Sequence, residues 1–296
     1  MKRKHLVRLL RPRQWLKNCL VFAPLVFARK ADDPGLWGFA LLAFLSFCAA
    51  ASAVYIFNDY RDRREDRLHP DKKDRPLASG AVPATTALGL AAVLVLVSLL
   101  LCVLVRPGLV LFPLLYLVVN VAYTLRLKHV VILDALCIAM GFLLRIVAGG
   151  EAIGVPCSSW LILCTLFVSL LLAFLKRRGE LKKLDETAGL HRKTLLDYNP
   201  GFLDRLTGPL AAMTVMAYSL YTVDQKTMAK LDGSRDLLLT VPLVIFGVFR
   251  YLYLADRGNR SDDPTGTLTR DLPIILAGLL WLALSALVVY GYGPGL

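Results

Sequence analysis

Residues 36–66 read LWGFALLAFLSFCAAASAVYIFNDYRDRRED, an apolar run that ends in a cluster of charged side chains. The apolar part, about 36–57, is as long as the roughly 20 residues that an α-helix needs to cross a bilayer. If the helix continues beyond it, Asn58, Asp62 and Asp66 repeat every four residues and Asp59 lies three before Asp62, so all four share one face. The stretch therefore predicts a membrane helix with a polar end.

Apolar runs of similar length recur along the 296-residue chain, which is 56% hydrophobic and only 19% charged. An ordinary soluble domain does not have this composition. We therefore expect an all-α, polytopic membrane helix bundle that forms one domain over residues 1–296. Its nine expected membrane helices cover about 16–30, 36–57, 84–105, 108–125, 131–150, 158–176, 206–222, 237–254 and 272–292.

The basic residues are distributed unevenly between the loops that join these helices. When loops are assigned alternately to the two sides of the membrane, one side holds 28 of the 35 Lys and Arg residues and the other holds six. This bias is the positive-inside signature. It predicts a protein of the cell (inner) membrane with its N-terminus and acidic cluster in the cytoplasm and its C-terminus outside. The net charge of +13 thus reflects topology and attraction for anionic substrates or lipid headgroups, not a nucleic-acid partner.

The acidic cluster has two interpretations. One amide and three carboxylates on one helix face repel each other unless a cation lies among them, and Mg²⁺ typically binds through one or two carboxylates plus substrate phosphates. Asn58, Asp59, Asp62 and Asp66 are then the ligands of a magnesium–diphosphate site at the membrane edge. The alternative is a solvated helix end whose aspartates pair with nearby arginines. Those arginines are Arg61, Arg63, Arg64 and Arg67.

Polar residues at the ends of two other spans are further candidates. Lys17 and Asn18 fall inside the first expected span, where polar groups usually face an interior cavity, although a basic membrane anchor also explains this segment. Lys176, Arg177 and Glu180 follow the sixth span and share a helix face at the expected height of the acidic cluster. The alternative for these three is a solvated basic loop.

Three more positions combine charge with an unusual environment. Arg75 precedes a proline and is a candidate hydrogen-bond donor to a substrate phosphate. Asp134 lies in an apolar stretch where an ionised carboxylate is costly, and Lys128 is the nearest cation in the sequence. Arg145 lies much deeper in the same span and indicates a functional site, with an ion pair between helices as the alternative.

Several other chemistries have no support in the sequence. The four histidines are scattered without a metal-binding spacing, so we expect no zinc site. Neither a GxxxxGK[ST] phosphate loop nor a GxGxxG motif after a strand is present, which argues against ATP hydrolysis and a dinucleotide cofactor. Charged residues in membrane spans also occur along transport paths, so a transporter or lipid carrier remains an alternative to an enzyme.

The NDxxDxxxD pattern at residues 58–66 resembles the UbiA superfamily of intramembrane prenyltransferases, and the spacing of Tyr123, Lys128 and Asp134 fits the same superfamily. The resemblance implies a helical bundle around a cavity open to the membrane, where Mg²⁺ bound to acidic motifs activates a diphosphate leaving group. Members that use prenyl diphosphates carry a second DxxxD-type motif after the sixth span. Here that position, 176–181, reads KRRGEL, which weighs against prenyl transfer to an aromatic acceptor.

Within the superfamily, the sequence is more similar to the group that transfers phosphoribose to polyprenyl phosphates. The resemblance implies phosphoribosyl diphosphate as donor, a polyprenyl (decaprenyl-type) phosphate as acceptor, Mg²⁺ as cofactor and a product that feeds arabinose donors for cell-wall glycans. Prenyl transfer remains the alternative, and the oligomeric state is left open. The matching segments are RPRQWLKN (11–18), NDYRDRREDRLHPDKKDRPLASG (58–80), LKHVVILD (127–134), GFLLRIVAGG (141–150) and KRRGEL (176–181).

The resemblance also assigns roles to the candidate residues. The expected catalytic and metal-binding aspartates are Asp59, Asp62 and Asp66, with Asn58 supporting the metal. The expected substrate-binding residues are Lys17, Asn18, Asn58, Arg75, Tyr123, Lys128, Asp134, Arg145, Lys176, Arg177 and Glu180.

Overall fold

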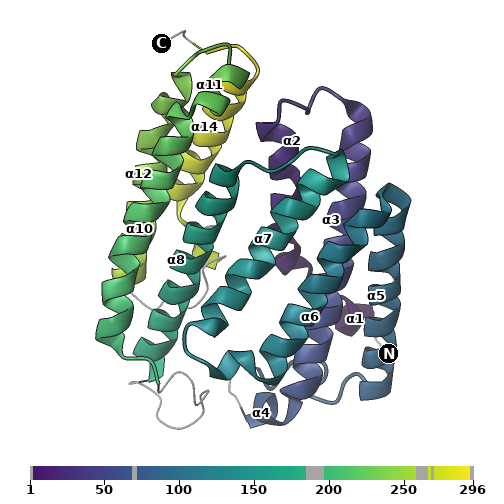
Figure 1. The fold of residues 1–296 in the computed structure, drawn as a ribbon. Coiled ribbons are helices and arrows are strands. Elements are labelled where there is room, and N and C mark those ends of the chain that lie inside the picture. Colours follow the sequence, from purple (N-terminus) through teal and green to yellow (C-terminus); the bar gives the residue numbers. More distant parts are fainter. Residues whose placement is uncertain (1–2, 69–71, 185–196, 258–265, 268–269, 294–296) are drawn as a thin grey trace. The chain divides into compact units, whose positions relative to one another are not determined.

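The computed structural model describes residues 3–68, 72–184, 197–257, 266–267 and 270–293 (Figure 1). Within these ranges every regular element is a helix, which confirms the predicted all-α class. The chain divides into two compact units, Met1–Cys157 and Ser158–Leu296. The single domain expected over residues 1–296 stays a prediction.

The first unit is built around one long helix, α3. The side chain of Asp33 caps its N-terminus by accepting a hydrogen bond from the backbone N–H of Gly35 over 2.8 Å. Along its length α3 packs against α5, η1, α6 and α7. The helices of this unit are α1 (Arg3–Leu10), η1 (Pro12–Phe22), α2 (Ala23–Phe27), α3 (Pro34–Arg61), α4 (Arg63–Leu68), α5 (Ala84–Val105), η2 (Pro107–Val110), α6 (Leu111–Leu125), η3 (Leu127–His129) and α7 (Leu133–Ile153).

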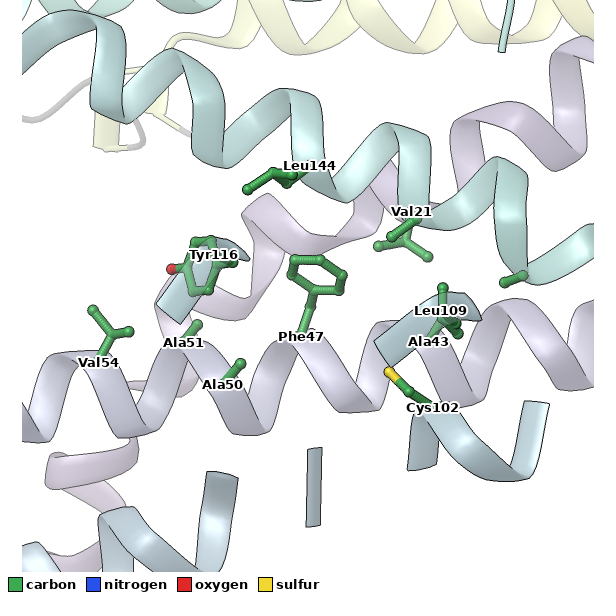
Figure 2. Packing of buried hydrophobic residues seen from close by; sticks show 12 residues of the cluster. Val21, Ala43, Phe47, Ala50, Ala51, Val54, Cys102, Leu109, Tyr116 and Leu144 are labelled. Carbon is green, nitrogen blue, oxygen red and sulfur yellow. The ribbon is translucent and has the colours of Figure 1, made fainter. Parts of the chain in front are cut away.

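Small side chains on α3 let the neighbouring helices approach closely. Figure 2 shows Ala43, Ala50 and Ala51 on α3, beside the larger ring of Phe47. That ring lies edge-on to the ring of Tyr116 from α6, with 5.7 Å between centroids. Close packing of small residues is a main source of helix association in a membrane, because lipid tails are as apolar as the side chains that they replace.

The first expected membrane helix, 16–30, has an irregular form, and its crossing of the membrane stays a prediction. The chain instead forms the 3-10 helix η1 and then the short helix α2, which carries Pro24 in its first turn and ends at Phe27. Two side-chain hydrogen bonds hold η1 against α3: Trp15 Nε1 donates to Ser52 Oγ over 3.0 Å, and Asn18 Nδ2 donates to Cys48 Sγ over 3.2 Å. Contacts with α3 thus outweigh the helical preference of the segment.

Two glycines of α7 make room for this irregular segment and for the loop after α7. A Cβ at Gly149 would collide with the backbone carbonyl oxygen of Val21 in η1, and one at Gly150 would lie 2.7 Å from Cys157 Sγ. The helix continues past both to Ile153. Gly149 and Gly150 therefore permit close packing.

Within the described residues, seven helices are long and apolar enough to cross a membrane, and they correspond to seven of the nine expected spans. Residues 206–222 are helical as expected within α10 (Pro200–Val223), which contains Pro209, but they are not among the seven. The count of nine therefore stays a prediction. The seven are Pro34–Arg61, Ala84–Val105, Pro107–Leu125, Leu133–Ile153, Ser159–Leu181, Asp236–Asp256 and Leu272–Val289.

A buried polar contact joins the helices of the second unit. The hydroxyl of Tyr218 on α10 lies 2.6 Å from Thr240 Oγ1 and accepts a hydrogen bond from Trp281 Nε1 over 2.8 Å. Interior hydroxyl and indole groups are thereby satisfied, as a membrane interior requires. The helices of this unit are α8 (Ser159–Leu184), α10, α11 (Gln225–Lys230), η4 (Asp236–Thr240), α12 (Val241–Arg257) and α14 (Leu272–Val289).

Candidate functional site

The acidic cluster begins where α3 ends. Arg61 is the last residue of α3, Asp62 occupies its C-cap, and Arg63 starts α4. The backbone N–H of Asp62 nevertheless donates to the carbonyl oxygen of Asn58 over 2.9 Å, and that of Asp66 to the carbonyl oxygen of Asp62 over 2.8 Å. The four-residue repeat expected for a continuous helix therefore persists through the junction.

Asp59 and Asp66 are the buried carboxylates of the cluster, with only 3% and 4% of their surface exposed. One nitrogen, Nη1 of Arg75, lies 3.0 Å from Asp59 Oδ1 and 2.8 Å from Asp66 Oδ2. Arg11 donates from Nη2 to the same oxygen of Asp59 over 2.6 Å, and its guanidinium lies 5.0 Å from the ring centroid of Tyr55. Two carboxylates and two guanidinium groups thus form a compact cluster without net charge.

The arginines nearest in sequence bond elsewhere. Arg63 donates to the carbonyl oxygen of Tyr60 over 3.2 Å, and Arg67 donates to that of Ala78 over 2.8 Å. Among the described residues, none of the four neighbouring arginines pairs with the aspartates of the cluster. The solvated helix end with local pairing is therefore not what the structure shows.

Asp62 and Asn58 face the end of α6 and the turn that follows it. Lys128 of η3 donates from Nζ to Asp62 Oδ1 over 2.9 Å, and Thr124 Oγ1 contacts Asn58 Oδ1. Lys128 and Thr124 are buried, and Tyr123 beside them is half-buried. The structure thus brings the second and fourth expected spans together at the predicted motif.

Asp134 is the second residue of α7 and is buried. Its Oδ1 accepts a hydrogen bond from the backbone N–H of Ala135 over 2.8 Å. Ile132, just before the helix, has a φ of 72°, a conformation that costs a β-branched residue free energy. The short connection from Lys128, which contacts the cluster, to Asp134 is therefore strained at Ile132.

Arg145 lies away from the acidic cluster, about 16 Å along α7 from Asp134 by helical rise. It is 5% exposed, and it donates to Asn18 Oδ1 over 2.6 Å, to the carbonyl oxygen of Gly141 over 2.5 Å and to the hydroxyl of Tyr116 over 3.1 Å. These partners are neutral, so the alternative of an ion pair between helices is not seen among the described residues. Lys17, next to Asn18 on η1, is half-buried.

Lys176, Arg177 and Glu180 lie on α8 in the second unit. Arg177 is 2% exposed and donates from Nη1 to Glu180 Oε2 over 2.6 Å, while Lys176 Nζ lies 3.8 Å from Glu180 Oε1. The shared face predicted for the three residues is confirmed by these contacts. Their approach to the acidic cluster stays a prediction.

The next residue on α8, Arg178, has a different environment. It pairs with Asp204 of α10 and, over 2.5 Å, with Asp256 of α12, so it joins three helices of the second unit. Of the three successive basic residues, Arg178 thus has partners on α10 and α12 and not on its own helix.

Sequence reasoning missed two residues of the cluster, Arg11 and Thr124. The basic N-terminal segment accounted for Arg11 as a membrane anchor, and a threonine inside an apolar helix carries little signal on its own. Arg11 has a φ of 50°, a left-handed conformation that arginine seldom adopts, and no local pattern predicts it. Only the fold shows that the N-terminal segment returns to the end of α3.

The donor set of the cluster fits Mg²⁺. Asp59 and Asp66 each point one oxygen at the same cationic nitrogen of Arg75, so two hard oxygen donors already converge on one positive charge. Within the described chain, no three His, Cys, Asp or Glu side chains gather in a group that could hold a metal. Two carboxylates suffice for Mg²⁺, which usually completes its coordination with water and substrate phosphates.

Nearly the whole chain is similar to known proteins. A model described as the UbiA prenyltransferase family matches residues 19–270. The chain is 33% identical to a decaprenyl-phosphate phosphoribosyltransferase of Mycolicibacterium smegmatis over 96% of this chain and 92% of that protein. It is 34% identical to the protein of the same name from Mycobacterium tuberculosis over 96% of this chain and 94% of that protein.

A solved structure shares the fold. It is a UbiA homolog from Archaeoglobus fulgidus bound to DMAPP and Mg²⁺, and it superposes with a TM-score of 0.73 over 96% of this chain and 98% of that chain. The two sequences are 21% identical. At this identity the likeness supports a common helical architecture and leaves the reaction to be argued from the residues.

Proposed function

The chain belongs to the UbiA prenyltransferase family, and from that premise we propose that it transfers 5-phosphoribose from 5-phospho-α-D-ribosyl 1-diphosphate to a polyprenyl phosphate of the decaprenyl type. Diphosphate is the second product. The relatives named decaprenyl-phosphate phosphoribosyltransferase support this reaction, because the match covers nearly the whole of both chains. Use of the product in arabinose-donor and cell-wall glycan synthesis stays a prediction.

The observation that carries this proposal is the ion-paired group on α8. Members of the superfamily that use prenyl diphosphates have a second acidic motif at this position. Here the one carboxylate, Glu180, is held by Arg177 and lies near Lys176, so the group presents positive charge. Such a group suits direct contact with phosphate better than a second metal ion. The donor carries a diphosphate and a 5-phosphate, and the lipid acceptor carries a third anionic group. A basic group suits this substrate pair better than a prenyl diphosphate and an aromatic acceptor.

Asp59 and Asp66 are the residues that would hold Mg²⁺, with Asp62 and Asn58 beside them. Bound there, the ion supplies Lewis-acid stabilisation of the negative charge that develops on the departing diphosphate. The Mg²⁺ named for the Archaeoglobus fulgidus homolog supports divalent-metal use in this fold. Because these two carboxylates are buried, the ion would lie in a fixed site with little water, where electrostatic stabilisation is strong.

The remaining chemistry needs positioning more than proton transfer. An oxygen of the lipid phosphate attacks C1 of the ribose while the bond from C1 to the diphosphate oxygen breaks, which predicts inversion at C1. A phosphate monoester is already ionised and nucleophilic, so no general base is required. Lys128 and Arg75 lie at the cluster, where they orient anionic groups of the substrates by charge-assisted hydrogen bonds.

The protein is a multi-pass membrane protein, and the polyprenyl tail requires an apolar surface that its spans provide. We propose that the acidic cluster faces the cytoplasm, because the loop from Asn58 to Gly80 lies on the side that carries most of the Lys and Arg residues. A water-soluble donor then reaches the cluster from the cytoplasm, and the lipid acceptor reaches it from the membrane.

A transfer assay with two substrate pairs tests the proposal. Membranes that contain the full-length protein receive labelled phosphoribosyl diphosphate with a polyprenyl phosphate, or labelled prenyl diphosphate with 4-hydroxybenzoate. We expect the label to enter the organic phase with the first pair only. Label transferred only in the second mixture would establish prenyl transfer instead.

Substitution of the acidic residues separates catalysis from folding. The double variant D59N/D62N should lose transfer by at least about a hundredfold, because preorganised electrostatic stabilisation is usually the largest contribution to such a reaction. Glu65 lies exposed between these positions and Asp66 and pairs with no other described residue, so E65Q is the matched control. A well-folded D59N/D62N variant with undiminished transfer would exclude the proposed metal role.

A further inference from the structure

Arg75 occupies the point at which a bound cation would be expected. Among the described residues, its Nη1 is the one nitrogen that bonds both buried carboxylates of the cluster, Asp59 and Asp66. Arg11 completes the arrangement on the other side of Asp59. A metal ion that binds Asp59 Oδ1 and Asp66 Oδ2 must displace Nη1 of Arg75, which bonds both of these atoms.

The charges of the cluster impose a second condition on metal binding. With Asp59 and Asp66 ionised and Arg11 and Arg75 protonated, the buried group is neutral. A divalent ion that entered alone would leave two uncompensated positive charges in a poorly hydrated site, which is unfavourable. The diphosphate of the donor brings at least two negative charges, so an ion that enters with the donor restores the balance.

The backbone of Arg75 is hydrogen-bonded within its loop, and its side chain is partly exposed. Arg75 donates its backbone N–H to the carbonyl oxygen of Lys72 over 3.0 Å, and its own carbonyl oxygen accepts from the backbone N–H of Ser79 over 2.8 Å. Its side chain is 29% exposed, in contrast to the carboxylates that it bonds. The guanidinium can therefore turn toward a ligand at the cluster without movement of the loop.

We propose that the Arg75 guanidinium occupies the position of the metal ion until the donor binds, and that it then positions the donor. In the absence of substrate it pairs with Asp59 and Asp66, which compensates the charge of the two carboxylates and shields them from solvent. When the donor arrives with its divalent ion, the ion takes the carboxylates and the Arg75 guanidinium moves onto a phosphate of the donor. This inference rests on the proposed function, and it makes binding of the metal and of the donor strongly coupled.

Manganese binding to the purified full-length protein in detergent tests the exchange directly. Mn²⁺ replaces Mg²⁺ as a probe because the electron paramagnetic resonance signal of free Mn²⁺ gives its dissociation constant without turnover. Titrations are made with Mn²⁺ alone and with Mn²⁺ plus phosphoribosyl diphosphate, with free Mn²⁺ corrected for the donor's own affinity. The variants are R75Q, R75K and R64Q. Arg64 lies exposed on α4 and forms no ion pair with another described residue, so R64Q matches the loss of one charge.

We expect R75Q to bind Mn²⁺ alone about tenfold more tightly than the wild type, the effect of removing one partly buried competing ion pair. R75K and R64Q should stay near the wild type. The donor should tighten Mn²⁺ binding strongly in the wild type and much less in R75Q, because the freed guanidinium is missing. Thermal unfolding of each variant verifies that R75Q is folded.

Two results would overturn the exchange. If folded R75Q binds Mn²⁺ alone no more tightly than R64Q does, Arg75 does not compete with the metal. If the donor tightens Mn²⁺ binding equally in R75Q and the wild type, Arg75 does not move onto the donor. Failure of the proposed function looks different: phosphoribosyl diphosphate would then tighten Mn²⁺ binding in neither the wild type nor any variant, and the transfer assay would move no label from it into lipid.

Discussion

Arg145 of α7 donates a hydrogen bond from Nε to Oδ1 of Asn18 in η1 over 2.6 Å, and both side chains are buried. The guanidinium also lies 4.7 Å from the ring centroid of Tyr116. A buried cation whose described partners are all neutral depends on hydrogen bonds to offset its lost hydration. The irregular segment η1 brings Asn18 to this position, so the broken first span and the buried arginine are parts of one arrangement.

The first prediction concerns this pair. Asn18→Leu should lower the free energy of unfolding by about 1–2 kcal/mol, because it leaves the Nε–H of Arg145 without an acceptor in the membrane interior. Asn18→Asp keeps an acceptor for that N–H and should cost less. Unfolding by SDS titration of the protein in mixed micelles measures both changes.

A double-mutant cycle shows whether the cost belongs to the pair. In an R145L background, the buried donor is gone, so Asn18→Leu should have little further effect. Equal costs in the two backgrounds would mean that Asn18 acts through another contact, such as the one with Cys48.

The second prediction concerns the close approach of α7 to η1. Gly149→Ala places a methyl group against the backbone carbonyl of Val21, and a backbone atom cannot move aside as a side-chain tip can. Overpacking of this kind costs about 1–3 kcal/mol. Gly89→Ala on α5 meets no atom within 4 Å and should be neutral or stabilising, since alanine favours helix. Unfolding curves of the two variants provide the comparison, and equal curves would contradict the prediction.

The length of the apolar runs predicted most of the fold, because a helix that crosses a bilayer needs about 20 apolar residues and other structural elements seldom need so many. It did not predict the form of the first span. The apolar content of 16–30 is high enough for a membrane helix, but Asn18 and Trp15 bond to α3 and hold the segment as a 3-10 helix. Tertiary contacts of this kind leave no period in the sequence.

Helical spacing predicted that the aspartates gather, and the backbone repeat from Asn58 to Asp66 follows the prediction. Spacing could not identify the cations that meet them. Arg11 is 48 residues from Asp59, and it lies in a basic segment that topology already explained. Partners so distant in sequence become visible only when the fold brings the two segments together.

The third prediction distinguishes two adjacent arginines of α8. Arg177 is almost fully buried beside Glu180, whereas Arg178 pairs with two carboxylates that remain largely exposed. Arg178→Gln leaves those carboxylates hydrated, so it should cost less than about 1 kcal/mol in stability and change transfer little. Arg177→Gln should lower transfer at least about tenfold, because it removes a cation assigned to substrate phosphate. Transfer assays with matched unfolding curves compare the two, and equal transfer rates would place Arg177 outside the site.

The last prediction concerns the hydroxyl proton of Thr124. Oγ1 of Thr124 is in hydrogen-bonding contact with Asn58 Oδ1 and lies 2.8 Å from the carbonyl oxygen of Asn120. A hydroxyl carries one proton, so it satisfies one of these acceptors at a time. When the proton goes to Asn120, the Asn58 amide can turn to donate to Oγ1, and its own oxygen then points away from Thr124 and is available to a ligand at the cluster.

Thr124→Val removes the hydroxyl that orients the Asn58 amide, with almost no change in side-chain volume. We expect transfer to fall about tenfold, the effect of losing roughly one oriented hydrogen bond at the site, while stability changes by less than about 1 kcal/mol. Thr124→Ser restores the hydroxyl and should recover most of the activity, and Thr86→Val, at an exposed position of α5, controls for the loss of a hydroxyl elsewhere. If valine at 124 transfers as well as serine, the hydroxyl does not orient Asn58, and the amide must be held by the cluster alone.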